Sequence, residues 1–192
     1  DFISSRATYF KSPHGLGNAR GACGYGDHGR TIYGGSVAAV SKLYRDGIGC
    51  GACYQVRCKI PGICSEDGDT VVAVDYGQGG DKGTDFILSE RAFSRLAASP
   101  DDAHELFAQG VVDVEFRRVP CRYGSNLLLA IREQSRRPGY LALLPIYQPD
   151  NYDIVGIDYY QDKEEEWKHM RKPYGAVWDV ENPPPGDLMV KI

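Results

Sequence analysis

Six cysteines constrain this chain more than any other feature of its sequence. They all lie in the first two thirds of the 192 residues, at Cys23, Cys50, Cys53, Cys58, Cys64 and Cys121. An even set of this size is typical of disulfide-bonded domains that fold in an oxidising compartment. The cysteines therefore predict a secreted domain, stapled by disulfides, that ends near Cys121.

A metal site is the alternative use of these cysteines. Cys50 and Cys53 form a CxxC pair, and Cys58 and Cys64 follow closely. A zinc ribbon needs a second CxxC or histidines at short spacing, and the sequence has neither. We therefore expect disulfides, no metal and no other cofactor. Six cysteines allow 15 pairings, and the spacing does not choose among them.

Length, charge and hydropathy exclude several classes of function. The 192 residues are enough for two small domains, and a hydrophobic content of 42% supplies their cores. A net charge of −4, without a basic stripe, argues against nucleic acid as a partner. No apolar run is long enough to cross a bilayer, so we expect no membrane insertion.

The first block of the chain reads as strands, glycine-rich loops and one helical stretch. Alternating or buried apolar residues predict strands over Tyr54–Ile60, Thr70–Asp75 and Val112–Val119. A helical pattern covers Ser89–Leu106, with a break at Ser99–Pro100 because proline does not continue a helix.

The second block has the pattern of a small β-sandwich, because short strands recur with turn signals between them. The expected strands are Leu127–Ile131, Tyr140–Tyr147, Ile154–Tyr160, Ala176–Val180 and Leu188–Ile192. The charged run Lys163–Trp167 is interpreted as a solvated turn.

Seven short motifs, in unbroken order, resemble the plant expansins, with the expansin-like A subgroup as the nearest match. They are ATYF at 7–10, GACGYG at 21–26, GCGACYQVRC at 49–58, FSRLA at 93–97, RRVPC at 117–121, YLALL at 140–144 and YGAVW at 174–178.

The resemblance implies a mainly β protein with two domains. A six-stranded double-psi β-barrel is expected over residues 1–122, followed by an immunoglobulin-like β-sandwich over residues 123–192. Since such sandwiches have ~100 residues, this one is expected to be truncated. The resemblance also implies the disulfides Cys23–Cys50, Cys53–Cys121 and Cys58–Cys64.

The barrel is similar to endoglucanases that invert configuration, which need two carboxyl groups roughly 6.5–9.5 Å apart. In expansins the catalytic base is missing, and Thr8 and Tyr9 match positions near that end of the groove. The remaining acid belongs to a His-Phe-Asp motif before Leu-Ser, where this chain has Asp85-Phe86-Ile87. Ile87 thus replaces the expected aspartate, and Asp85 stands in the place of the histidine. Hydrolysis is not expected.

One carboxylate matches the family pattern directly. Asp75 ends a buried strand and corresponds to an aspartate in the floor of the expansin groove, although an aspartate before Tyr76-Gly77 also suits a turn cap. The resulting hypothesis is a substrate groove lined by Thr8, Tyr9, Asp75 and Asp85.

Aromatic rings provide flat apolar surfaces on which sugars stack. Tyr140 and Tyr174 match two positions in the line of aromatic residues with which the expansin sandwich binds polysaccharide. Trp178 follows Tyr174 at even spacing, so it either shares that face or fills the sandwich core.

These features together predict a monomeric, secreted protein of the plant cell wall. Its expected partner is a cell-wall β-glucan, cellulose or hemicellulose, and its expected action is to loosen contacts between polysaccharides without hydrolysis. Two alternatives stay open: a barwin-like carbohydrate- or protein-binding module without loosening activity, and a weak endoglucanase.

Overall fold

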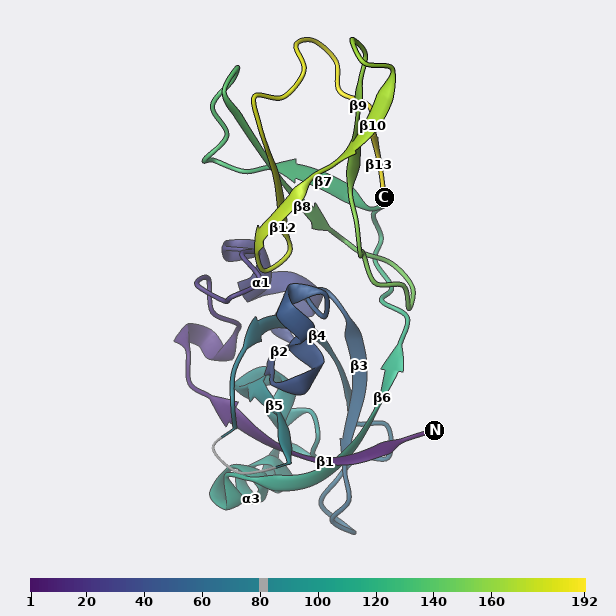
Figure 1. Ribbon diagram of the computed structural model, residues 1–192. Coiled ribbons are helices and arrows are strands. Elements are labelled where there is room, and N and C mark those ends of the chain that lie inside the picture. Colours follow the sequence, from purple (N-terminus) through teal and green to yellow (C-terminus); the bar gives the residue numbers. More distant parts are fainter. Residues whose placement is uncertain (80–82) are drawn as a thin grey trace.

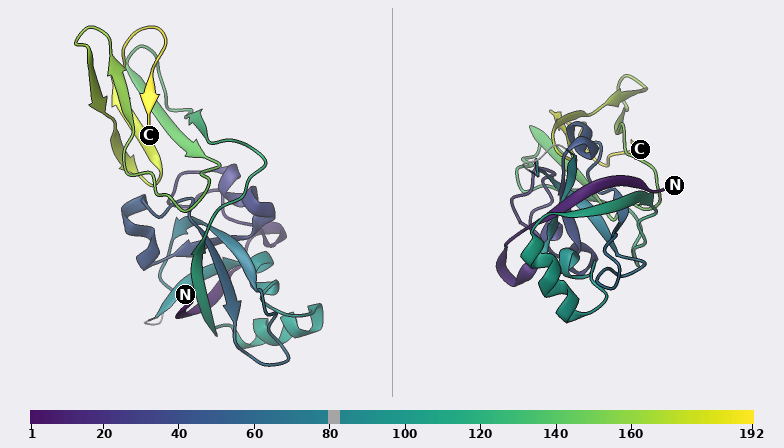
Figure 2. Two further views of the ribbon diagram at one scale, coloured as in Figure 1. Left: turned by 90° about the vertical axis from the view of Figure 1, so that its right-hand side faces the viewer. Right: turned by 90° about the horizontal axis from the view of Figure 1, so that it is seen from below.

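A computed structural model describes residues 1–79 and 83–192, that is, all of the chain except residues 80–82. Two β domains lie end to end, with the N-terminus in one and the C-terminus in the other (Figure 1). The left view of Figure 2 shows the same arrangement from the side, with the second domain on one end of the first. The fold class predicted from the sequence is confirmed.

The first domain is a closed barrel with the strand order β1-β5-β2-β4-β3-β6. Its strands are β1 (Ile3–Phe10), β2 (Val37–Val40), β3 (Cys53–Cys58), β4 (Asp69–Tyr76), β5 (Thr84–Ser89) and β6 (Val112–Val119). The pairs β1–β5 and β2–β4 are parallel, and the other neighbours are antiparallel. Large apolar side chains such as Phe86, Leu88 and Val56 fill the interior.

Short helices cover the barrel. The α-helices are α1 (Asp27–Thr31), α2 (Glu90–Ser94) and α3 (Pro100–Gln109), and the 3-10 helices are η1 (Pro13–Gly15), η2 (Ile32–Gly35) and η3 (Lys42–Gly47). Ser89 and Ser99 cap α2 and α3, since each hydroxyl accepts a hydrogen bond from a backbone N–H three residues on. Pro100 opens α3, so the predicted break in the helical stretch is correct.

All six cysteines are paired, in the combination that the resemblance implies. The bridges are Cys23–Cys50, Cys53–Cys121 and Cys58–Cys64. The first holds the loop of residues 21–26 against the segment before β3, and the second ties β3 to the chain that leaves β6. These two disulfides therefore fix the end of the barrel that faces the second domain, whereas Cys58–Cys64 belongs to the barrel core.

The second domain is a sandwich of two sheets, with strand orders β11-β12-β8-β7 and β10-β9-β13. Its strands are β7 (Leu128–Ile131), β8 (Tyr140–Ile146), β9 (Asp158–Gln161), β10 (Glu166–His169), β11 (Arg171–Tyr174), β12 (Val177–Glu181) and β13 (Val190–Lys191). Leu141, Leu143, Tyr159 and Val180 pack between the sheets.

Trp178 belongs to this core, so of its two predicted positions the core is correct and the polysaccharide-binding face is wrong. The side chain is 7% exposed, lies opposite Leu143 on β8 and packs among the residues between the sheets. The reason is the alternation of β12: Val177 and Asp179 point outward, so Trp178 points inward.

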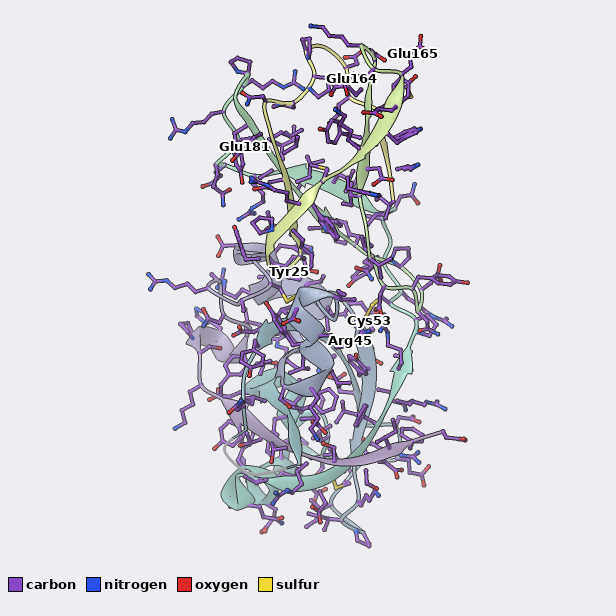
Figure 3. All side chains as sticks on the ribbon, viewed as in Figure 1. Tyr25, Arg45, Cys53, Glu164, Glu165 and Glu181 are labelled. Carbon is purple, nitrogen blue, oxygen red and sulfur yellow. A yellow bond between two sulfur atoms is a disulfide. The ribbon has the colours of Figure 1, made fainter. Side chains whose placement is uncertain are left out.

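The acidic run after β9 is partly a strand. The turn covers residues 162–165, β10 begins at Glu166, and Trp167 lies opposite Tyr160 on β9. Glu164 and Glu165 mark the tip of this hairpin, at the end of the molecule farthest from the barrel (Figure 3). The prediction of a solvated turn therefore holds only for the tip.

One hydrophobic cluster joins the two domains. Val72 and Val74 of the barrel pack in the same cluster as Ala142, Leu144 and Val177 of the sandwich. The outer face of the four-stranded sheet therefore rests with one end on the barrel.

Polar contacts reinforce this junction. Asp153 accepts hydrogen bonds from Arg45 at 2.9 Å and from Arg118 at 3.0 Å. The backbone N–H of Ala176 donates to the carbonyl of Cys23 at 2.9 Å. Arg45, Cys53 and Tyr25 are seen near the level where barrel and sandwich meet (Figure 3).

Candidate functional site

Four barrel strands align one residue each into a row on the outside of the barrel. Ile87 lies opposite Thr8 on one side and Ala39 on the other, and Ala39 lies opposite Asp75. Residues paired across neighbouring strands point to the same side of a sheet. The row Thr8–Ile87–Ala39–Asp75 therefore defines one surface, called here the barrel face.

Asp75 is held in place by backbone groups. Its Oδ1 accepts a hydrogen bond from the N–H of Ala22 at 2.6 Å and another from the N–H of Tyr76 at 2.8 Å. No described residue donates to Oδ2, which leaves this oxygen for a hydroxyl group of a ligand. The turn-capping role and the binding role therefore coexist in one side chain.

Two tyrosines lie beside this carboxylate. The rings of Tyr44 and Tyr76 are 5.2 Å apart, and Gln78 donates to the Tyr76 hydroxyl at 3.1 Å. Burial, with a smaller contribution from the negative charge of Asp75, raises the pKa of Tyr44. Tyr76 is 47% exposed. The sequence reasoning did not select either tyrosine, although Tyr76 directly follows Asp75.

Asp85 faces the same side as Ile87, as strand alternation predicts, but its carboxylate is already occupied. Oδ2 accepts from the Ser5 hydroxyl at 2.8 Å and Oδ1 from the Ser41 hydroxyl at 3.2 Å. These contacts link β5 to β1 and to the end of β2. Asp85 thus acts as a tie between strands, two strands away from Asp75 in the barrel order.

Tyr9 does not line the barrel face, and this part of the predicted groove is wrong. Its ring packs against Phe93 at 4.9 Å and Phe107 at 4.8 Å, on the core side of β1. Thr8 points the other way and donates its hydroxyl to the carbonyl of Gly110 at 2.8 Å. The next residue on the Thr8 side of the strand is Phe10, which the prediction missed.

The outer side of the four-stranded sheet forms a second surface, called here the sandwich face. Tyr140 lies opposite Glu181, and Tyr174 lies opposite Val177, so both tyrosines point outward with Asp179 between them. The sequence prediction that these two tyrosines share a face agrees with this register.

Asp179 organises the sandwich face. The Tyr140 hydroxyl donates to its Oδ2 at 2.6 Å, and this hydrogen bond to a carboxylate raises the pKa of Tyr140 to about 12. Arg171 donates to both oxygens of Asp179, at 2.9 Å and 3.2 Å. The bidentate pair compensates a carboxylate that is otherwise buried, and it fixes the position of the Tyr140 ring.

The ring of Tyr174 lies across the sheet. Its hydroxyl accepts a hydrogen bond at 3.0 Å from Gln134, which follows β7 at the edge opposite to β11. Tyr174 is 45% exposed, so it presents a flat apolar surface to solvent.

One loop connects the two faces. A Cβ atom on Gly24 would lie 2.9 Å from Cε2 of Tyr174, so glycine lets the loop approach this ring. Two residues earlier, Ala22 donates its N–H to Asp75. The loop of residues 21–24 therefore contacts the carboxylate of the barrel face and the aromatic ring of the sandwich face.

Neither a metal centre nor a membrane span is found in the part of the chain that the structure describes. Residues 1–79 and 83–192 hold no cluster of three histidine, cysteine or acidic side chains placed to bind a metal ion. Within the same residues no helix combines the length and the apolar character needed to cross a bilayer.

Comparison with known proteins gives the relatives of this chain. Residues 36–116 match a family model described as lytic transglycolase, and residues 128–192 match the expansin C-terminal domain. Expansin-like B1 of Arabidopsis thaliana is 51% identical over 194 residues, which cover 100% of this chain and 76% of the relative. Expansin-like A3 of the same plant is 40% identical over 191 residues, which cover 98% of this chain and 71% of the relative. The predicted resemblance to expansins is therefore confirmed, and within it expansin-like B1 is more similar to this chain than the predicted A subgroup.

Solved structures of low sequence identity share the fold. Apo expansin of Clavibacter michiganensis superposes with a TM-score of 0.75 at 18% identity, over 99% of this chain and 84% of that one. A mutant of that expansin, in complex with cellohexaose, gives a TM-score of 0.74 at 20% identity, with the same coverage. With a barrel and a sandwich in the same order, and plant relatives that match over its whole length, the chain belongs to the expansin family.

Proposed function

We propose that this protein binds β-linked polysaccharide of the plant cell wall along the barrel face and the sandwich face, and loosens contacts between polysaccharides without hydrolysing them. The observation that carries the proposal is the loop of residues 21–24, which contacts both Asp75 and Tyr174. A polymer that follows this loop meets a carboxylate, exposed hydroxyls and a flat ring in succession.

The chemistry of the barrel face favours binding over hydrolysis. Inverting hydrolysis needs an acid and a base on opposite sides of the linkage. Ile87 stands in the row where the family pattern has an acid, and Asp85 is bonded to Ser5 and Ser41. Of the described carboxylates on the barrel face, Asp75 alone offers an open oxygen, which suits a hydrogen bond to a sugar hydroxyl rather than a paired acid–base reaction.

The two faces match the two kinds of surface that a sugar chain presents. Pyranose rings have apolar faces, which stack on aromatic rings, and hydroxyl groups at their edges. Tyr174 and Tyr140 provide the rings, while Asp75 and Gln78 provide acceptors and donors. A protein that makes such contacts competes with the contacts between polysaccharide chains, which is how loosening follows from binding.

The expected setting is the cell wall, and the expected state is a secreted monomer. Three disulfides fit an oxidising compartment outside the cytosol.

Binding, hydrolysis and loosening are measured on the same samples. Sedimentation with cellulose and with xyloglucan gives affinity, a reducing-sugar assay gives hydrolysis, and creep of a heat-inactivated wall strip under load gives loosening. We expect Tyr174→Ala to weaken binding roughly 10-fold, about 1–2 kcal/mol, since the ring loses its stacking contact. Tyr152→Ala is the control, because Tyr152 is 79% exposed but lies off both faces.

Each contrary outcome points to a different activity. Reducing ends that are released by the wild type and lost in Asp75→Asn would make the protein an endoglucanase. Binding without creep would make it a carbohydrate-binding module of the barwin-like kind. Equal binding by Tyr174→Ala and wild type would remove the sandwich face from the site.

A further inference from the structure

The loop between β7 and β8 presents two arginines to the sandwich face. The N–H of Arg132 donates to the carbonyl of Ala142 at 2.9 Å, which extends the pairing of β7 with β8 by one residue. Arg136 and Tyr140 exchange two backbone hydrogen bonds of 2.9 Å. Paired residues share a side, so Arg132 and Arg136 point outward with Ala142 and Tyr140.

The residue between these arginines confirms the direction of the loop. Gln134 lies halfway along it and reaches the Tyr174 hydroxyl on the same face. The Ser135 hydroxyl is bonded to both backbone groups of Ala142, which holds the loop against the sheet.

Both guanidinium groups lack an acidic partner among the described residues. By contrast, Arg171 on the opposite edge binds Asp179 and also lies 3.3 Å from Glu181. The Nε of Arg132 is buried and has no hydrogen-bond partner among the described residues, whereas Arg136 is exposed to solvent.

The charges on the sandwich face are therefore unevenly distributed. At the β11–β12 edge two carboxylates, Asp179 and Glu181, share the single guanidinium of Arg171, which leaves a negative excess. At the β7–β8 edge Arg132 and Arg136 leave a positive excess. Their Cα atoms lie opposite residues that are two positions apart on β8, a spacing of about 7 Å, so both groups can reach one substituent.

From this arrangement we infer that the sandwich face recognises a polysaccharide with a neutral β-linked backbone and uronic acid side groups. The backbone stacks on Tyr140 and Tyr174, and the carboxylate of a side group binds Arg132 and Arg136. Guanidinium groups match carboxylates in shape and charge, whereas a neutral glucan gives them no anion. This inference rests on the proposed function, since it names the substrate class of the same surface.

A backbone with a carboxylate on every sugar fits the face less well. Such a chain would place negative charge at the β11–β12 edge, beside Glu181, as well as at the arginines. A side group that points only toward the β7–β8 edge avoids this repulsion.

The test compares polymers that differ only in the carboxylate. Affinity is measured for glucuronoxylan, for the same glucuronoxylan after chemical reduction of its carboxyl groups, and for polygalacturonate. We expect the wild type to bind native glucuronoxylan about five-fold more tightly than the reduced polymer. Added salt is expected to narrow this difference, because the ions screen an exposed charge contact.

Matched variants assign the effect to the two arginines. Arg136→Gln and Arg132→Gln are each expected to lower the preference for the native polymer, and the double variant is expected to abolish it. Arg91→Gln is the control, since Arg91 is an exposed arginine of α2 on the barrel and its loss changes the net charge equally. Melting curves verify that all variants are folded, and Arg136 is exposed, so its replacement does not disturb the core.

The outcomes separate this inference from the proposed function. Equal affinity for native and reduced glucuronoxylan, with cellulose still bound, would overturn the inference and leave the function standing. Tighter binding of polygalacturonate than of glucuronoxylan would overturn the assignment to side groups. Failure to bind any of these polymers or cellulose would overturn both.

Discussion

The barrel and the sandwich hold their candidate binding groups in different ways. On the barrel, the Cys23–Cys50 bridge anchors the loop that donates to Asp75, so a covalent bond fixes the carboxylate's surroundings. The sandwich contains no cysteine, and its tyrosines depend on packing between two sheets and on contact with the barrel. The barrel therefore presents a polar group in a fixed position. The sandwich presents aromatic side chains whose position relative to that group depends on the packing between the two domains.

The largest effect is expected from the core of the sandwich, which has no covalent support. Trp178→Ala leaves a cavity between the sheets and should destabilise this domain by about 3–5 kcal/mol. Calorimetry should show a separate early transition for the sandwich, while the barrel melts as before. Trp167→Ala is the control, since Trp167 is 40% exposed and its loss should cost about 1 kcal/mol or less. A single shared transition would show that the domains unfold as one unit.

The barrel bridges should differ from one another in a graded way. A disulfide stabilises more when it closes a longer loop, and Cys53–Cys121 closes 68 residues whereas Cys58–Cys64 closes 6. Replacing the first pair with serines should cost about 4 kcal/mol, and replacing the second about 2 kcal/mol. Denaturant unfolding of the two double variants measures the loss in the free energy of unfolding for each bridge. Equal losses would mean that local packing, rather than loop closure, decides the contribution of each bridge.

A smaller effect should follow at the junction between the domains. Asp153→Asn removes the charge that binds Arg45 and Arg118, and should cost about 1 kcal/mol because the pair is partly exposed to solvent. If the sandwich depends on the barrel for its position, binding to cellulose should weaken as well. Asp162→Asn, in the exposed turn at the hairpin tip, is the control that should change neither property.

The smallest effect concerns pH. His28 lies between the rings of Tyr25 and Tyr147, and its burial lowers the pKa of the imidazole below its usual value of about 6.5. The unfolded chain then binds the proton more readily, so the stability that His28 contributes is present above about pH 6.5 and is lost as the pH falls below it. Melting temperatures between about pH 7.5 and 5 should fall less steeply in His28→Gln than in wild type. If the melting temperatures of wild type and His28→Gln fell equally with pH, His28 would not be the group that causes the loss of stability.

The sequence was most informative where one strand has a clear pattern. The alternation of Val112–Val119 predicts β6 with its bounds, and the proline at residue 100 predicts the start of α3. The first strand, β1, was not expected as such, because its polar residues hide the alternation, and the acidic run likewise obscured β10. These strands form because their neighbours complete a sheet, which no local pattern records.

For the candidate site, the sequence predicted which strands carry the residues, and the structure corrects the direction in which two of the side chains point. Thr8, Asp75, Tyr140 and Tyr174 point to the outside as expected, whereas Tyr9 and Trp178 point inward, and in both cases an adjacent residue takes the outward place. The contacts of Gln134 with Tyr174 and of Ser5 and Ser41 with Asp85 join segments far apart in the chain. Such contacts depend on the register between distant strands, which a single sequence does not reveal.

Gly175 lies so close to the barrel that the orientation of the sandwich depends on the absence of a side chain at this position. Its φ is +52°, and a Cβ atom there would lie 2.4 Å from the carbonyl oxygen of Ala22. Because backbone meets backbone, no side chain can rotate away to make room. One added methyl group would act as a wedge, and its displacement would grow with distance from the contact. The hairpin tip at Glu164 would swing farthest and Tyr174 least, so the two ends of the sandwich are unequally sensitive to a change at a single position.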